Sequence, residues 1–338
     1  MKPLLFLAAA LTLLVTGCAH VDTRADLHRI IDHPRVALAP EAGEWRATND
    51  LAQIQFSFAA DAQSRVPGIL FKSPSSKGRR PVVIALHGTG GNKEGMTPLC
   101  RKLVEHGFIA VAIDARYHGE RKKAQGTDDY NAAIVKAWHG SGEHPLYYDT
   151  VWDVTRLVDY LETRDDVDPM RIGIIGISKG GIETYFAAAA DPRLVVAVPC
   201  IGMQSFSWAL KNNDWQGRIA TIQSSFDTVA KESGEAKPDS AFVKEFYDRV
   251  VPGIDTEFDG PQMMRLIAPR PLLIINGDSD VHTPLPGVQE CIATGDKAYA
   301  TAHAKDKFTF IIEEKSGHTV TPEAEKAALD WFVKWLKP

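Results

Sequence analysis

The sequence predicts an α/β fold built on a mostly parallel, doubly wound sheet, and its apolar patterning carries this prediction. From residue 54 onward, apolar runs of strand length alternate with amphipathic helical stretches, and the later runs are continuously apolar, as in strands buried on both faces. The first two runs have only a short connection, which predicts an antiparallel pair ahead of the β-α alternation. The predicted strands are Ile54–Phe58, Gly68–Phe71, Val82–Leu86, Phe108–Ile113, Ile172–Ile175, Leu194–Val198, Leu272–Ile275 and Phe308–Ile312.

Composition sets the scale of the fold and excludes one class of partner. The chain has 338 residues, of which 44% are hydrophobic and 24% charged, enough for one large buried core. The formal net charge is −5, and Lys and Arg are scattered rather than gathered into a stripe. Nucleic acid is therefore not an expected partner.

The first residues resemble the export signal of a bacterial lipoprotein. Lys2 precedes an apolar run from Leu4 to Val15, which is followed by Thr16-Gly17-Cys18. The run is too short for a membrane span, which needs roughly 20 residues, and is typical of a signal peptide. We expect residues 1–17 to be removed, Cys18 to carry lipid, and the chain to be anchored on the periplasmic side of the outer membrane. The alternative is an ordinary secretion signal cut near Ala19.

The rest of the chain divides into a lead-in and one domain. Residues 18–48 contain several Pro, Gly and charged residues and are predicted to be a tether and irregular lead-in, with the main domain over 49–338. Residues 203–270 exceed a normal connection and hold many aromatics. We expect a helical cap that narrows the pocket, because insertions after strand ends lie where α/β folds bind ligands. The alternative is a peripheral decoration that packs its own aromatics.

A candidate nucleophile stands between an apolar strand and a helix. The segment is Gly176-Ile177-Ser178-Lys179-Gly180, a GxSxG pattern followed by a helix to about Ala190. In a nucleophile elbow the turn is so tight that the flanking positions must be glycine, and the helix N-terminus favours developing negative charge. The alternative is a serine in a purely structural turn.

A glycine-rich turn follows the strand at 82–86 and supplies candidate oxyanion donors. Its residues are His87-Gly88-Thr89-Gly90-Gly91. We expect the backbone amide of Thr89, or of Gly90, to join the amide of Lys179 in a two-donor oxyanion hole. His87 is expected to be a structural hydrogen-bonding residue beneath the turn rather than the base.

The acid and the base should follow the nucleophile in chain order, at later strand ends. The strand ending at Gly277 runs into Asp278-Ser279-Asp280, and Asp280 is the predicted acid with Asp278 as the alternative. His318 is the predicted base, because among the candidate histidines it alone follows the last strand and precedes the last helix.

These motifs together resemble the α/β-hydrolase superfamily over roughly residues 50–336. The turn at 87–91, the segment Asp114 to Glu120, the elbow with Gly180-Gly181, and the run Arg270 to Gly277 are similar to the dienelactone-hydrolase-like, acetyl-xylan-esterase-like and prolyl-oligopeptidase-like branch. True dienelactone hydrolases carry a cysteine nucleophile, so their substrate is not carried over. Arg116 and Tyr117 follow a strand end and are candidate pocket residues, with a structural ion pair as the alternative for Arg116.

The resemblance implies a serine hydrolase that cleaves a carboxylic ester through an acyl-enzyme. The aromatic insertion, by narrowing the pocket, is expected to favour small acyl groups such as acetyl. It requires no metal and no cofactor. The expected partners are a small-molecule or carbohydrate ester and, through the lipid, a membrane. The alternatives are a serine peptidase of the prolyl-oligopeptidase-like type, against which the missing β-propeller repeats count, and a non-catalytic binding lipoprotein.

Overall fold

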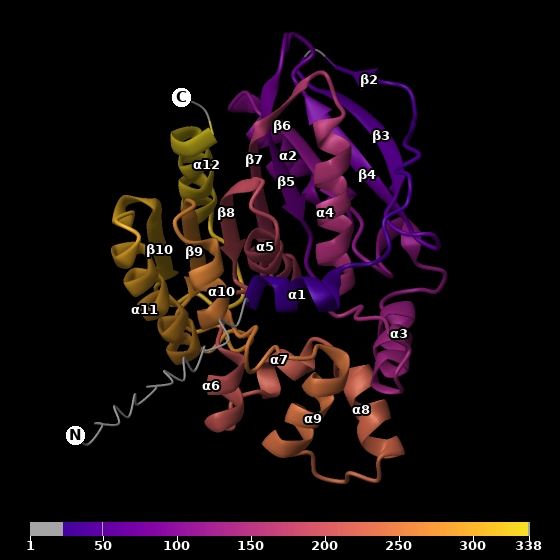
Figure 1. Ribbon diagram of the computed structural model, residues 1–338, viewed down its shortest axis with the longest axis vertical. Coiled ribbons are helices and arrows are strands. Elements are labelled where there is room, and N and C mark those ends of the chain that lie inside the picture. Colours follow the sequence, from indigo (N-terminus) through magenta and orange to yellow (C-terminus); the bar gives the residue numbers. More distant parts are fainter. Residues whose placement is uncertain (1–22, 49, 337–338) are drawn as a thin grey trace, which may run out of the picture.

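One mixed sheet organises the part of the chain described by the computed structural model, residues 23–48 and 50–336 (Figure 1). The strand order is β1-β3-β4-β6-β5-β7-β8-β9-β10, with β2 paired to β3. Strands β3, β4 and β6 are antiparallel neighbours, and β6 through β10 are parallel. The strands are β1 Glu41–Ala42, β2 Arg46–Ala47, β3 Ala52–Ala59, β4 Arg65–Lys72, β5 Arg80–Leu86, β6 Ile109–Ile113, β7 Val167–Ile177, β8 Leu194–Cys200, β9 Leu272–Gly277 and β10 Phe308–Glu313. All of the predicted strands are present, and the predicted fold class is confirmed.

Helices cover both faces of the sheet, as the continuously apolar strands require. Helices α2 and α12 enclose one apolar core, and α1, α4, α5 and α11 enclose the other. The described helices are α1 Thr23–Ile31, α2 Thr97–Glu105, α3 Asp128–Trp138, α4 Tyr148–Glu162, α5 Lys179–Ala190, α6 Phe206–Lys211, α7 Gln216–Ala220, α8 Gln223–Glu232, α9 Ser240–Val250, α10 Gly260–Ile267, α11 Leu285–Thr301 and α12 Pro322–Leu336, with short 3₁₀ turns η1 Glu94–Met96, η2 Gly119–Arg121 and η3 Lys305–Lys307.

The long insertion is helical and packs largely on itself. Helices α6 to α9 lie with α3 beyond the end of β8, and α3 packs against α8 and α9 (Figure 1). Trp138 of α3 stacks on Phe246, and Phe226 meets Phe242 edge to face. These rings are buried in a core that α3 and the insertion share. The aromatics that were expected to narrow the pocket therefore stabilise the insertion, because clustered rings bury more surface among themselves than over an open cleft.

The segment before β3 is more ordered than predicted. An irregular lead-in was expected over 18–48, but α1 occupies residues 23–31 with Leu27 and Ile31 fully buried. Arg24 adds hydrogen bonds to the carbonyls of Ala189 and Leu266, at 2.9 Å to the first. The expectation of a tether is wrong for this helix, since two apolar residues one turn apart were enough to dock it. Cys18 and the predicted signal peptide lie outside the described residues.

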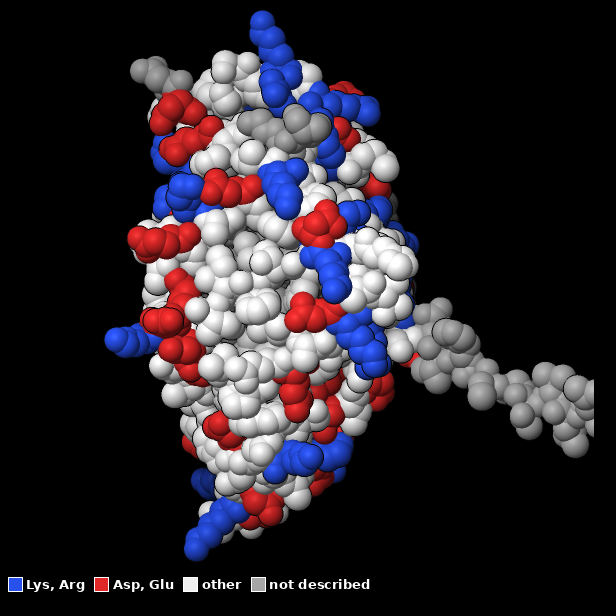
Figure 2. All heavy atoms as spheres, turned by 90° about the vertical axis from the view of Figure 1, so that its left-hand side faces the viewer, with Lys and Arg blue, Asp and Glu red and all other residues white. Residues whose placement is uncertain are grey.

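Charges on the face formed by α11, α12 and β10 are mixed in sign. Figure 2 shows acidic and basic side chains interspersed around an uncharged central area on this face. Over the described residues, no helix is both long enough and apolar enough to cross a membrane.

Candidate active site

The elbow holds Ser178 in a conformation that only its glycine neighbours permit. Ser178 follows β7 and precedes α5 with φ 59° and ψ −116°. A β-carbon at Gly176 would lie 2.1 Å from the carbonyl oxygen of Gly180, and one at Gly180 would lie 2.4 Å from that of Leu86. Any larger residue at either position would force the strand, turn and helix apart. The GxSxG spacing is thus a steric requirement of this turn.

The structure brings the three predicted triad residues together. The hydroxyl of Ser178 donates to Nε2 of His318 over 2.7 Å, and Nδ1–H of His318 donates to Oδ2 of Asp280 over 2.7 Å. This direction of donation assigns the proton of the neutral imidazole to Nδ1 from the surrounding hydrogen bonds. The arrangement can activate a hydroxyl and stabilise a transient imidazolium.

Asp280 is held in place by more than the histidine. Its Oδ2 accepts a hydrogen bond from Thr283 Oγ1 at 2.7 Å, and its Oδ1 accepts the backbone N–H of His282 at 2.8 Å. Burial raises the pKa of Asp280, but the hydrogen bonds from His318 and Thr283 outweigh burial, so the pKa lies below its usual value. Asn276 at the end of β9 donates to Thr283 and fixes that hydroxyl. The carboxylate is therefore ionised and oriented toward the imidazole.

The alternative acid, Asp278, has a different role in the geometry. Its carboxylate accepts the backbone N–H groups of Lys315 and Ser316. These bonds tie the turn after β9 to the loop that carries His318. Among the described residues Asp278 makes no hydrogen bond to His318, so its role is to stabilise the loop that carries the base.

The predicted oxyanion donors lie around the elbow. Lys179 is the first residue of α5, where a backbone N–H has no intrahelical acceptor. A β-carbon at Gly88 would lie 3.3 Å from Cβ of Ser178, so the turn that continues into Thr89 and Gly90 approaches the nucleophile closely. Gly90 has φ +76°, a left-handed backbone conformation that favours glycine.

His87 has the structural role that its position predicts. Its Nδ1–H donates to the carbonyl of Gly88 at 2.8 Å, and its Nε2 accepts the N–H of Ala115 at 3.1 Å. Burial lowers the pKa of His87 to about 4, against the opposing effect of the bond to Gly88. A neutral ring that both donates and accepts fixes the shape of the glycine-rich turn.

The side chain of Lys179 turns inward, away from solvent. Its Nζ bonds Glu183 one turn along α5 and lies 5.6 Å from the ring centre of Tyr130. Burial raises the pKa of Glu183 to about 6, although Lys179 acts to lower it. This buried pair uses the side chain of Lys179 to support the start of α5. The backbone N–H of Lys179 takes no part in the pair.

Arg116 and Tyr117 are not brought to the triad. Arg116 pairs with Asp153 and Asp61, at 3.0 and 2.7 Å, which matches the structural alternative for this residue. Tyr117 donates to Glu143 at 2.6 Å. Both line a cavity of about 810 Å³ whose lining contains no triad member. Because Arg116 is paired with two acidic side chains, its guanidinium has a structural role and is not part of the site around the triad.

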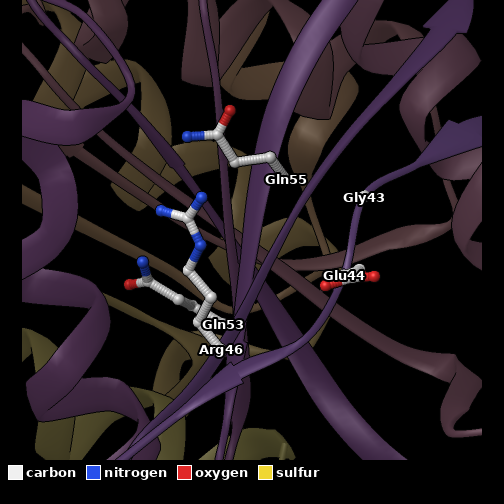
Figure 3. A pocket seen from close by; sticks show the side chains of 5 residues that line it. All are labelled: Gly43, Glu44, Arg46, Gln53 and Gln55. Atoms are coloured by element: carbon white, nitrogen blue, oxygen red, sulfur yellow. The ribbon is translucent and has the colours of Figure 1, made fainter.

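Two further cavities bracket the sheet. One of about 280 Å³ includes His318, Ile177 and Val320 in its lining and opens on the side of α12. Another of about 320 Å³ lies over the antiparallel edge and is lined by Gly43, Glu44, Arg46, Gln53 and Gln55 (Figure 3). The second holds amide, guanidinium and carboxylate groups but no nucleophile. The chemistry therefore belongs to the strand ends near the first.

Sequence reasoning missed the residues that the insertion brings to the acid loop. The ring of His282 meets that of His318 edge to face with centroids 4.6 Å apart, and its Nδ1–H donates to the carbonyl of Gly217 in α7 at 2.5 Å. The side-chain amide of Gln204 donates to the carbonyl of His282 and accepts the Nε–H of Arg218. Nothing in the sequence signals it, because residues 204, 217 and 282 come together only through long-range packing. Over the described residues, no group of three or more His, Cys, Asp or Glu side chains is arranged to hold a metal ion.

The fold and the arrangement of nucleophile, base and acid define the class of the protein: it is an α/β-hydrolase of the serine esterase type. The chain belongs to the family described as "Glucuronyl esterase, fungi", whose sequence model matches residues 60–302. It is therefore a carboxylic ester hydrolase.

Individual relatives and solved structures agree with the family. The chain is 25% identical to "Putative hydrolase YtaP" of Bacillus subtilis over 82% of this chain and 85% of that protein. It is 24% identical to the 4-O-methyl-glucuronoyl methylesterase of Podospora anserina, over 54% of this chain but only 38% of that protein. Acetyl xylan esterase 1 from Thermoanaerobacterium sp. superposes with a TM-score of 0.68 at 19% identity, covering 94% of each chain, which shows a shared fold.

Proposed function

We propose that this protein hydrolyses a carboxylic ester through a covalent acyl-enzyme with Ser178 as the nucleophile. The observation that carries the proposal is the unbroken relay from Ser178 through His318 to Asp280, with 2.7 Å at each step. Ser178 Oγ bonds to the acyl carbon while Nε2 of His318 takes the hydroxyl proton and returns it to the departing alcohol oxygen. Water, deprotonated by the same nitrogen, then attacks the acyl carbon and releases the acid and Ser178.

The negative charge that develops on the acyl oxygen is stabilised by backbone N–H groups. The free first-turn amide of Lys179 and the amide of Thr89 after the close Gly88 turn are the proposed donors, with Gly90 as the alternative to Thr89. Each such donor contributes about 10²–10³ in rate. Preorganisation by the His87 hydrogen bonds supports this assignment, because a fixed turn does not reorganise during the reaction.

The proposed substrate is a carbohydrate ester with a small acyl group, acetyl first. The family match and the names of relatives and neighbours, which include acetyl xylan and glucuronoyl esterases, support a carbohydrate ester. A methyl ester of a glucuronic acid unit is the second candidate, favoured by the family that matches residues 60–302. A peptidase would share the triad, and a non-catalytic binding protein would have no need of the relay.

A substrate panel tests the proposal directly. Purified full-length chain in mild detergent is assayed on aryl acetate, acetylated xylo-oligosaccharides, methyl glucuronate and an aminoacyl amide, with labelling by a fluorophosphonate in parallel. We expect labelling and turnover of the acetyl esters, with C12 esters slower than acetyl esters. The Ser178→Ala variant is the control and should lose both signals. Faster turnover of the amide than of every ester would replace the esterase by a peptidase.

A further inference from the structure

Helix α7 of the insertion docks on the loop that carries the acid. A β-carbon at Gly217 would lie 1.8 Å from the carbonyl oxygen of Val281, so the two backbones are in contact. The carbonyl of Gly217 also accepts the hydrogen bond from His282, whose ring meets His318. Burial lowers the pKa of His282, and the positive charge of the next residue, Arg218, lowers it further, so this charge acts on the ring that contacts the proposed base.

Arg218 is a buried cation without a counter-ion. Its residue surface is 4% exposed. Its Nε–H donates to the side-chain oxygen of Gln204 at 2.9 Å in the amide orientation that satisfies both neighbours, but its Nη2 has no hydrogen-bond partner among the described residues. No ion pair joins Arg218 to a carboxylate within the described chain. A buried guanidinium with unused donors is costly unless something else supplies an acceptor.

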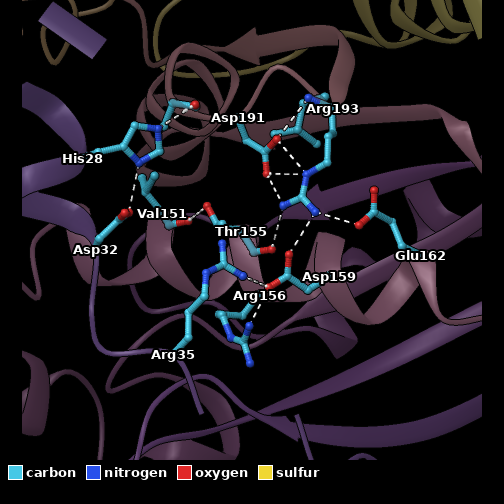
Figure 4. Close-up of polar contacts among 12 residues, drawn as sticks. His28, Asp32, Arg35, Val151, Thr155, Arg156, Asp159, Glu162, Asp191 and Arg193 are labelled. Carbon is cyan, nitrogen blue, oxygen red and sulfur yellow. Dashed lines mark hydrogen bonds and ion pairs between the residues drawn. The ribbon is translucent and has the colours of Figure 1, made fainter. Parts of the chain in front are cut away.

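Two other arginines of this protein, half-buried Arg193 and buried Arg116, have carboxylate partners. Figure 4 shows Arg193 held by Asp191, Asp159 and Glu162, with the carbonyl of Thr155 as a further acceptor. Arg116 likewise pairs with two aspartates. Arg270 has no carboxylate partner but donates to four backbone carbonyls, whereas the Nη2 of Arg218 has no acceptor of either kind among the described residues.

The surroundings of Arg218 connect it to the nucleophile as well as to the base. Gln204, its partner, follows Gly202 by two residues, and a β-carbon at Gly202 would lie 2.7 Å from the carbonyl oxygen of Ser178. Arg218 and Glu183 also both act on the buried phenol of Tyr147, whose pKa burial raises to about 12. Glu183 is already paired with Lys179, and among the described residues no ion pair joins Glu183 to Arg218.

We propose that Arg218 recognises a free carboxylate on the substrate, so that the preferred substrate is an ester carrying a second, unesterified carboxylate. The guanidinium fork would bind this group through two N–H donors, which a planar carboxylate matches. The inference rests on the proposed function and deepens it. Anionic esters of acidic sugars or of dicarboxylic acids belong to this class.

Matched ester pairs test the inference. The full-length chain is assayed on 4-acetoxybenzoate against 4-acetoxybenzamide, with the carboxylate on the alcohol side, and on monomethyl succinate against methyl succinamate, with the carboxylate on the acyl side. We expect kcat/KM to favour the charged member of at least one pair. Loss of a hydrogen bond to a charged group changes binding by about ten- to a hundredfold, and Arg218→Gln should reduce the preference by this factor, mainly through KM. Arg218→Lys keeps the positive charge and should keep part of the preference for the charged ester.

Controls separate this inference from the proposed function. Arg265→Gln removes an exposed arginine of α10 whose recorded partner is Gln262, and it should keep the full preference. Equal kcat/KM within both pairs would overturn the inference while leaving the esterase in place. If no ester is turned over, the proposed function fails, and thermal shift decides the inference. Benzoate, but not benzamide, should then raise the melting temperature of the wild type, and neither compound should raise that of Arg218→Gln. A melting temperature that benzoate does not raise in the wild type, or raises equally in Arg218→Gln, would overturn the inference.

Discussion

The catalytic frame and the inserted helices are built by different kinds of interaction. In the frame, the elbow, the acid turn and the histidine loop follow the ends of β7, β9 and β10, and short-range backbone sterics place them. In the insertion over 203–270, helices pack through aromatics, and the insertion reaches the acid loop at Gly217 and Gln204. The difference teaches that the triad geometry is encoded locally, whereas the selectivity proposed for Arg218 would depend on contacts between distant segments.

The largest expected effect comes from breaking the frame at its nucleophile. Ser178→Ala should lower kcat by about 10⁴–10⁶, and His318→Ala by a comparable factor, because triad members act as a unit. The double variant should cost little more than either single one. Steady-state kinetics on an aryl acetate measures this, with the melting temperature as the control for folding. Fluorophosphonate labelling that persists in Ser178→Ala would move the nucleophile elsewhere.

The acid turn offers a sharper test, since it holds two carboxylates two residues apart. Asp280→Asn should lower kcat by about 10⁴, because the amide cannot hold the imidazole in the required tautomer. Lys315 and Ser316 donate to different oxygens of Asp278, so Asp278→Asn keeps one of these two bonds, and because Asp278 does not orient the imidazole it should lower kcat far less. The same assay compares the two variants. The opposite ranking would make Asp278 the acid.

The sequence was sufficient for the frame because each of its parts has a local cause. The glycines around Ser178 are dictated by backbone contacts within one turn, and Asp280 and His318 follow apolar strands in a fixed chain order. The sequence could not decide whether Arg116 lines the pocket or forms a structural ion pair. Its partners Asp61 and Asp153 are distant in the chain, and only the packing of α4 against the sheet brings them together.

The same limit applies to α1 and to the insertion. Helix α1 is short and ordinary in composition, and its docking depends on a surface formed by α4 and α5. The aromatics of the insertion carry no signal that distinguishes an internal core from a pocket lining. Arg218 carries none either, because an unpaired cation can be recognised only when its surroundings are known.

A β-carbon at Gly217 would disturb the contact between insertion and frame. Gly217→Ala places a methyl group against the Val281 carbonyl, so α7 must shift, at a cost of about 1–3 kcal/mol in the free energy of unfolding. Urea denaturation measures this cost. Gly43→Ala is the matched control, because its β-carbon meets only an ordinary contact at 3.6 Å. Equal stability of the two variants would show that α7 is not docked on the acid loop.

Acidification should also destabilise the protein, and the residues responsible belong to the frame. Burial holds the pKa of His87 at about 4 and that of His118 well below its usual range. Their pKa values when unfolded are about 6.5, so below that pH the unfolded chain binds more protons and the folded state loses stability. The loss should approach about 1.4 kcal/mol per pH unit for each histidine between pH 6 and 4. His87→Gln should give a shallower slope in urea denaturation across this range, and an unchanged slope would remove His87 from the account.

The smallest effect on turnover should come from Cys18, where the lipid is proposed to attach. The triad and the proposed oxyanion donors all follow residue 80 and α1 is docked on the body, so Cys18→Ala should leave kcat on a short soluble ester unchanged. Because Cys18 precedes α1 by five residues, which reach under about 20 Å even when extended, a lipid there would hold the body close to the membrane surface. In a bacterial host that processes lipoproteins, Cys18→Ala should move the protein from the membrane fraction to the soluble fraction, while Ala19→Ser should not. A Cys18→Ala protein that still sediments with membranes would exclude the lipid anchor and leave the ordinary secretion signal as the explanation of residues 1–17.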